Sequence, residues 1–131
     1  MGVRLTEDAV DLIDGRNFGH LATLMSDGSP HVTPVWVDRE GDLILVNTAV
    51  GRIKQRNLTR DPRVAIDVVD QENPYQMVSI RGHVVAQSQE GADEHIDRLA
   101  KKYLGKDKYP YRQLGEKRII LKVELEKIIT I

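Results

Sequence analysis

Hydrophobic residues recur with a helical period at three places along this chain and alternate with polar residues over most of the rest. In the first helical stretch, residues 6–14, Val10 and Ile13 share one face. Thr6 is suited to cap this stretch, because its hydroxyl can accept a hydrogen bond from the first turn. Gly15 follows the last helical position, so the pattern predicts a short opening helix.

The second helical stretch is basic and the third is amphipathic. The basic stretch ends near Arg60, because Asp61 precedes Pro62 and the residue before a proline avoids helical torsions. The third stretch covers residues 90–104, where apolar side chains recur at helical spacing and form one stripe. The stripe consists of Ala92, Ile96, Leu99 and Tyr103.

Six extended segments account for most of the remaining chain. Alternation or an excess of β-branched residues, bounded by turn signals such as Ser26-Asp-Gly-Ser29, identifies them. They are residues 18–25, 31–37, 43–47, 64–69, 75–87 and 119–131. Residues 38–42 are predicted to form a turn. Gly82 interrupts the fifth segment, as a β-bulge or a sharp bend would require.

Short turns join most of these strands, which favours an antiparallel sheet, and a bend among six strands favours a closed or split barrel. We therefore expect a mainly β protein, a β-barrel with flanking helices, in which residues 1–131 form a single domain. The alternation of the last strand breaks at Ile128, which leaves apolar side chains on both faces. Burial on both sides would explain this break, and so would a core combined with a subunit contact.

Composition narrows the class of protein. Apolar residues make up 40% of the chain and charged residues 30%, which is typical of a globular protein. No apolar run approaches the roughly 20 residues of a membrane span, and the net charge of −1 argues against a dedicated nucleic-acid binder. There is no cysteine, and the four histidines show no metal-ligand spacing, so no metal site is predicted. Without a signal-like N-terminus, a cytoplasmic location is expected.

One stretch departs from the near-neutral charge of the chain. Between residues 52 and 63, five fixed cations are opposed only by Asp61. They are Arg52, Lys54, Arg56, Arg60 and Arg63. Backbone N–H groups at a helix N-terminus attract anions, and alternating basic side chains can hold phosphate oxygens from two sides. The run is therefore either an anion site or a solvated basic helix face.

The order of several motifs resembles a known family. The motifs are Asp27-Gly-Ser-Pro-His-Val-Thr-Pro-Val-Trp36, Val46-Asn-Thr48, Gly51-Arg-Ile-Lys-Gln-Arg-Asn-Leu58, Asp61-Pro-Arg-Val64 and Asn73-Pro74 followed by Arg81-Gly82. Together they are similar to the pyridoxamine-phosphate-oxidase-like split barrels. Within these, the chain is most similar to the small deazaflavin-dependent reductases that use coenzyme F420. The resemblance covers residues 5–130 and implies an FMN-binding-like split β-barrel.

The resemblance implies a homodimer with cofactor sites at the subunit interface and hydride transfer between F420 and a small organic substrate. Use of flavin mononucleotide (FMN) on the same fold is the alternative, and a non-catalytic carrier of flavin or haem is a further one. The basic segment would hold the cofactor phosphate, and the strand ending at Trp36 would lie along the ring. The residues that the resemblance assigns to the cofactor are Thr33, Pro34, Val35, Trp36, Thr48, Gly51, Arg52, Ile53, Lys54, Asn57, Tyr75, Gln76 and Met77.

The chain departs from the family members that act on pyridoxine phosphate. These carry a C-terminal arginine-containing motif that grips the substrate, whereas this chain ends in a strand at Ile131 with Arg118 as its last arginine. Oxidation of the vitamin is therefore not expected, and the sequence names neither the substrate nor a catalytic residue. His31, next to the ring-facing strand, is either a proton donor or an ordinary surface histidine.

Other candidate residues have ordinary structural interpretations. Tyr109 and Tyr111 are expected to anchor their loop to the barrel. Arg60 and Arg63 are expected to pair at the surface with Asp61 or Asp67, where such pairs contribute little.

Overall fold

The computed structural model describes residues 3–130. In chain order its elements are α1 (Glu7–Asp14), β1 (Phe18–Leu24), β2 (Pro30–Trp36), β3 (Asp38–Glu40), β4 (Leu43–Ala49), α2 (Ile53–Arg60), β5 (Arg63–Val69), β6 (Met77–Ser88), α3 (Ala92–Leu104) and β7 (Arg118–Thr130). None of these helices is long and apolar enough to cross a membrane.

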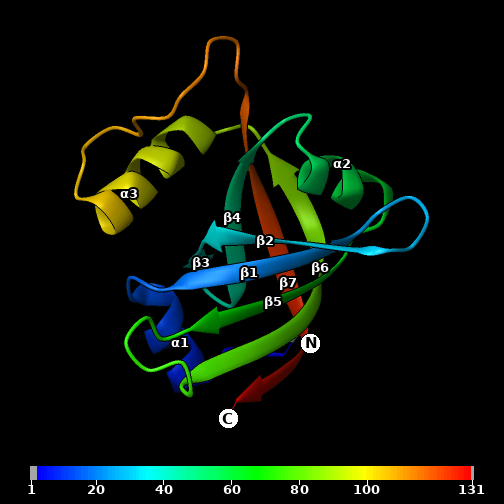
Figure 1. Ribbon diagram of the computed structural model, residues 1–131, viewed down its shortest axis with the longest axis vertical. Coiled ribbons are helices and arrows are strands. Elements are labelled where there is room, and N and C mark those ends of the chain that lie inside the picture. The colour runs from blue at the N-terminus through cyan, green and yellow to red at the C-terminus, as the bar shows by residue number, and fades with distance from the viewer. Residues whose placement is uncertain (1–2, 131) are drawn as a thin grey trace.

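The strands form one antiparallel sheet in the order β2-β1-β5-β6-β7-β4-β3. The long strands β6 and β7 pair with each other, while β5 and β4 attach at opposite ends of that ladder. The register of the ladder shifts between Arg81 and Gly82 and again between Val84 and Ala86. These irregularities bend the two strands, and the sheet curls into the half-barrel seen in Figure 1. The predicted fold, a mainly β split barrel with flanking helices, is confirmed.

Gly82 permits the closest approach within the bend. A Cβ atom at this position would collide with the backbone oxygen of Glu124 on β7. The sequence-based prediction of a bend near Gly82 is therefore correct, and its physical cause is the contact between two backbones.

Three clusters of buried apolar side chains stabilise the described part of the chain; the third, Ile96, Leu99 and Tyr103 on α3, packs against Trp36. The first fills the curled sheet with inward side chains and is closed by α1; its largest fully buried members are Ile13, Leu21, Ile44, Ile66, Ile80, Leu121 and Leu125. The second lies between α3 and the outer side of the sheet, where Leu45 and Ile120 meet Ala92. The side chains of Leu45 and Ile120 point to the outer face of the sheet, which would normally be exposed. They are buried because α3 covers this part of the outer face.

The boundaries of the elements differ from the prediction in a few places. The predicted turn at 38–42 contains a short strand, β3, because Asp38–Glu40 pair with Leu43–Leu45 around a tighter turn. The fifth predicted segment starts later: Tyr75 and Gln76 belong to a turn in which the Gln76 N–H donates to Asn73 O at 2.9 Å.

The ends of the chain agree with the prediction where the structure describes them. Thr6 caps α1 by accepting a hydrogen bond from Ala9 N at 3.2 Å. In the last strand, Ile128 packs on the core while Ile129 remains 46% exposed on the other face. Ile131, the last residue of the predicted strand, lies outside the described residues.

Candidate functional site

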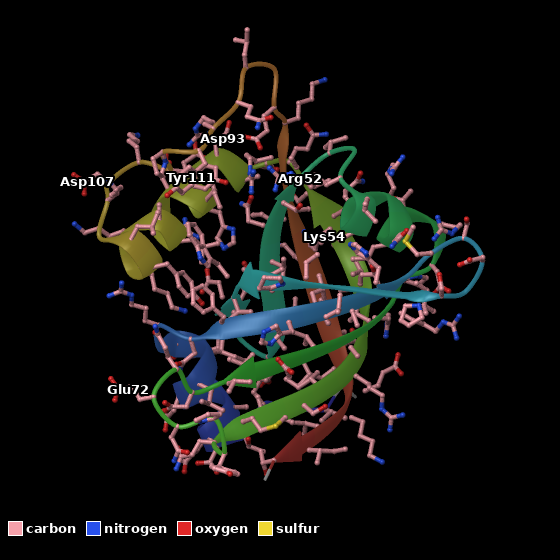
Figure 2. The ribbon with its side chains drawn as sticks, viewed as in Figure 1. Arg52, Lys54, Glu72, Asp93, Asp107 and Tyr111 are labelled. Carbon is pink, nitrogen blue, oxygen red and sulfur yellow. The ribbon has the colours of Figure 1, made fainter. Side chains whose placement is uncertain are left out.

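A cavity of about 290 Å³ lies where the end of β2, the end of β4, the start of α2 and the loop between α3 and β7 converge. Its walls are formed by Phe18, Pro34, Val35, Trp36, Asn47, Thr48, Arg52, Lys54, Ile96, Tyr109, Tyr111 and Arg118. Figure 2 shows Arg52 and Lys54 on the α2 side, and Tyr111 beside α3. One wall is therefore cationic and the opposite wall is aromatic.

The cationic wall is built around one carboxylate. Arg52 follows Gly51, whose φ of 94° turns the chain into α2, and its Nη2 lies 3.2 Å from Glu116 Oε1. Arg118 Nη1 donates to the same oxygen at 2.8 Å. With Lys54, the wall holds three cations against a single carboxylate, so the cavity carries a surplus of positive charge that favours an anionic ligand.

Lys54 is half-buried, and it forms no ion pair among residues 3–130. Burial lowers the pKa of its ammonium group, and the positive charges of Arg52 and Arg118 lower that pKa further. The folded protein therefore holds this charge at a cost in free energy. An anion bound beside Lys54 would offset that cost.

The aromatic wall is a set of stacked and edge-on rings. Trp36 stacks on Tyr103 with the ring centroids 5.2 Å apart, and Tyr109 meets Trp36 edge-on at 5.9 Å. Arg118 lies over the Tyr109 ring at 5.1 Å, which joins the aromatic wall to the cations. Asp97 on α3 fixes the loop by accepting a hydrogen bond from Tyr109 N at 2.8 Å. The expectation that this tyrosine anchors its loop is correct, but the ring also lines the cavity.

Thr48 supplies a polar group that lacks a protein partner. The residue lines the cavity, and its hydroxyl is buried just behind the cavity surface, yet this hydroxyl makes no hydrogen bond within the described part of the chain. Leaving such a group unsatisfied is unfavourable, so a ligand that hydrogen-bonds to it would stabilise the site. The buried hydroxyl of Thr33, on strand β2, is likewise without a hydrogen bond in the described residues.

Six of the residues assigned from the sequence line this cavity. They are Pro34, Val35, Trp36, Thr48, Arg52 and Lys54. Thr33, Gly51 and Ile53 are their chain neighbours and do not line it themselves. Asn57 faces away from it: its side chain is buried and donates to Thr23 Oγ1 at 3.0 Å, so it attaches α2 to β1.

Tyr75, Gln76 and Met77 do not join the cavity. Tyr75 is 85% exposed, and the other two line a separate hollow near α1. Figure 2 marks the preceding loop with Glu72, at the opposite end of the sheet from Arg52 and Lys54. Within one chain, the geometry therefore separates this segment from the cationic wall.

Sequence reasoning missed half of the cavity. Phe18, Asn47, Ile96, Tyr109, Tyr111 and Arg118 line it without having been assigned to a site. Arg118 marks a strand boundary in the sequence, and only the pairing of Ala49 with Arg118 between β4 and β7 places it beside Arg52. The close spacing of Tyr109 and Tyr111 was the one local signal available.

The remaining basic residues pair in other ways. Arg63 pairs with Asp61 at 2.8 Å, as expected. Arg60 differs from the expectation, because its Nη2 donates to Leu24 O at 2.6 Å and to Asn57 Oδ1 at 3.1 Å. Asp67 pairs with His20 at 2.6 Å rather than with an arginine.

Comparisons with known proteins agree with this architecture. The chain is similar to a solved structure described as an F420 reductase, with 27% identity, 95% of this chain and 98% of that chain covered, and a TM-score of 0.82. A conserved hypothetical protein from Mycobacterium tuberculosis (24% identity, 98% and 86% covered, TM-score 0.73) and General Stress Protein 26 from Bacillus anthracis (18%, 95% and 92%, 0.69) share the fold. The sequence pattern of the family described as pyridoxamine 5'-phosphate oxidase matches residues 5–131. The chain belongs to this family.

Proposed function

We propose that this protein is an oxidoreductase that binds coenzyme F420 in the cavity between Arg52, Lys54 and Trp36 and transfers a hydride between that cofactor and a small organic substrate. The observation that carries the proposal is the pairing of a cationic wall with an aromatic wall in one cavity. A phosphorylated planar cofactor needs both, because its phosphate requires cations and its ring requires an apolar slot. Similarity to an F420 reductase along 95% of the chain supports F420 over FMN.

The cationic wall would hold the phosphate. Arg52 and Lys54 approach it from the start of α2, and Arg118 approaches it from β7. The first N–H groups of α2 add favourable partial charge. The unpartnered hydroxyl of Thr48 fits a phosphate or ribityl oxygen, which would satisfy this buried group.

The aromatic wall would hold the ring. When bound, the deazaflavin supplies hydride chemistry, and the protein supplies position and exclusion of water. Trp36 is fixed by its stack on Tyr103, so the surface it offers to the ring is already in place. Tyr111 is 62% exposed at the mouth of the cavity, where a substrate would enter.

A homodimer would complete the site, and this is part of the proposal. On the outer face of the sheet, Val32, Ala22 and Ala65 form one cross-strand row over β2, β1 and β5. Val32 is 62% exposed, and Phe18, which is 42% exposed, adjoins both this face and the cavity. A second copy of the chain packed over this row and over Phe18 would cover the open side of the cofactor site.

Titration of the purified protein with F420 and with FMN, followed by cofactor fluorescence, tests the proposal. We expect micromolar or tighter binding of F420, with Arg52→Ala and Lys54→Ala each weakening it by roughly tenfold or more, because each removes a charge-assisted hydrogen bond. Arg63→Ala is the matched control, since Arg63 pairs with Asp61 outside the cavity.

The outcomes separate the alternatives. Absence of F420 binding at micromolar concentration contradicts the proposal. Tighter binding of FMN identifies an FMN enzyme of the same fold. Binding without turnover of any reducible substrate identifies a flavin carrier, and the same titration with haem tests a haem carrier.

A further inference from the structure

A chain of part-buried hydrogen bonds lies behind the cationic wall. It begins at Asp38 on β3, passes through His95 on α3 and Asn47 on β4, and ends at Arg118 on β7. His95 is fully buried and Arg118 is 4% exposed. Only the last two members, Asn47 and Arg118, line the cavity. The first two form a layer beneath it.

The orientation of the Asn47 amide is fixed from both sides. Its Nδ2 donates to Ala92 O at 2.9 Å, and its Oδ1 accepts from Arg118 Nε at 2.9 Å. A flipped amide would set oxygen against the carbonyl of Ala92 and nitrogen against the guanidinium of Arg118. Because Nδ2 therefore faces α3, it is a donor to His95 Nδ1, which lies 3.1 Å away.

This contact determines the tautomer of His95. Nδ1 accepts from Asn47, so the ring proton is on Nε2 and is donated to Asp38 Oδ2 at 2.9 Å. Burial by itself would raise the pKa of Asp38, but hydrogen bonds from His95 and Arg39 N and the charge of Lys102 together hold that pKa below its ordinary value. Asp38 is thus an ionised acceptor that fixes the imidazole ring.

Arg118 is held by the far end of the chain. Asn47 accepts from its Nε, Glu116 accepts from its Nη1 at 2.8 Å, and Tyr109 covers the guanidinium plane. Among residues 3–130, Nη2 donates to no protein group. A guanidinium restrained at two nitrogens, with a third free at the cavity, is already oriented to bind an anion and loses little entropy on doing so.

We propose that His95 and Asn47 are positioning residues for Arg118, with Asp38 holding only the imidazole ring of His95, and that Arg118 contacts the anionic group of the bound ligand. The role in ligand binding rests on the proposed function. The orientation of Arg118 by His95 through Asn47 does not, because it is a property of the unliganded protein. A residue that only filled space in the core would not need a specific tautomer.

Two substitutions at His95 separate positioning from space filling. In His95→Asn, the side-chain oxygen falls near the former Nδ1, so Asn47 keeps its acceptor while Asp38 loses its donor. In His95→Gln, the terminal amide falls near the former Nε2, so Asp38 keeps a donor while Asn47 loses its acceptor. Glutamine is nearer to histidine in volume, so a space-filling role makes His95→Gln the milder change. Positioning makes His95→Asn the milder change.

The first readout uses the protein without ligand. We expect nitrogen NMR of the unsubstituted protein to show His95 protonated at Nε2 and unprotonated at Nδ1. The Nε–H of Arg118 should exchange slowly with water, roughly tenfold faster in His95→Gln, and nearly unchanged in His95→Asn. A proton on Nδ1 overturns the proposal, even if neither variant folds. Equal exchange in the two folded variants overturns it as well.

The second readout is affinity for F420 and for FMN. We expect His95→Gln to weaken binding by about threefold to tenfold, the range for one hydrogen bond, and His95→Asn to remain within about twofold of the unsubstituted protein. If the unsubstituted protein binds neither cofactor, the proposed function fails while the exchange measurement still decides the positioning role. If His95→Gln binds as tightly as the unsubstituted protein, Arg118 is not positioned through His95 for this ligand.

Discussion

Lys54 shows, at the scale of one residue, how a binding site can conflict with stability. Its ammonium group is half-buried beside two other cations, and its lowered pKa means that the folded state holds the charge less readily than the unfolded state does. At pH values below this lowered pKa, Lys54 is charged in both the folded and the unfolded state, and its charge destabilises the folded state by the full amount. As pH rises from the lowered pKa to the ordinary value near 10.5, Lys54 loses its proton and the destabilisation disappears.

Lys54→Met should therefore stabilise the unliganded protein. We expect the melting temperature at pH 7 to rise by roughly 1–3 °C, because methionine keeps the unbranched stem and removes the unfavourable charge. The gain in melting temperature should shrink as pH approaches 10.5. The Lys54→Met variant should also bind F420 more weakly than the unsubstituted protein. Calorimetry across pH measures this, with Lys106→Met, at an exposed position, as the control. A melting temperature that falls at pH 7 would show that Lys54 is compensated in the folded protein.

Helix α3 is the element that connects the barrel core to the aromatic wall. Tyr103 attaches it, because its hydroxyl donates to Asn17 O at 2.6 Å and accepts from Val37 N at 3.0 Å. The same ring supports Trp36 and Phe18 by stacking. The docking of one helix therefore fixes part of the cavity wall.

Tyr103→Phe should destabilise the protein by about 1–3 kcal/mol, because the buried N–H of Val37 and the part-buried carbonyl of Asn17 lose their hydrogen-bond partner. Burial raises the pKa of Tyr103 to about 12. The unfolded chain ionises first, so stability from this residue is complete below pH 10 and is lost as pH rises to about 12. Denaturant unfolding of both proteins from pH 8 to 12 checks this, with Tyr75→Phe as the exposed control. If the free energy of unfolding changes with pH in the same way for Tyr103→Phe and for the unsubstituted protein, the pH dependence does not come from the Tyr103 hydroxyl.

At the scale of the whole molecule, the curled sheet has one face filled by the core and an outer face that remains partly apolar. The row formed by Val32, Ala22 and Ala65 lies on this outer face, and the exposed ion pair of His20 with Asp67 separates it from Phe18 at the cavity end of β1. Small and apolar side chains in a row allow close approach of a second sheet. This is the surface on which the proposed dimer would form.

Val32→Glu should convert the expected dimer to a monomer, because a carboxylate would be buried without a partner in the interface. Analytical ultracentrifugation measures the change. Val85→Glu is the matched control. Val85 is also an exposed valine, with 44% of its surface exposed against 62% for Val32, but it lies on β6 outside this row. A dimer that survives Val32→Glu would place the interface elsewhere, and a monomeric unsubstituted protein would contradict the proposed assembly.

The sequence by itself determined the features that depend on neighbouring residues. Thr6 and the alternation of the strands each act within a few residues, and the predicted helices and strands follow from them. Gly82 marks the bend in the sequence, although the contact that requires glycine there is with the distant backbone of Glu124. The sequence also located the basic segment that contains Arg52 and Lys54, and the family resemblance assigned these two residues to the cofactor phosphate.

Only the tertiary structure decided which distant residues complete the cavity. Pairing between β4 and β7 brings Arg118 and Glu116 to Arg52, and packing of α3 places His95 beneath Asn47. The same long-range geometry separates Tyr75 from this site. Local patterns cannot predict such contacts, because strand order and register are set by burial of the whole sheet rather than by any one segment.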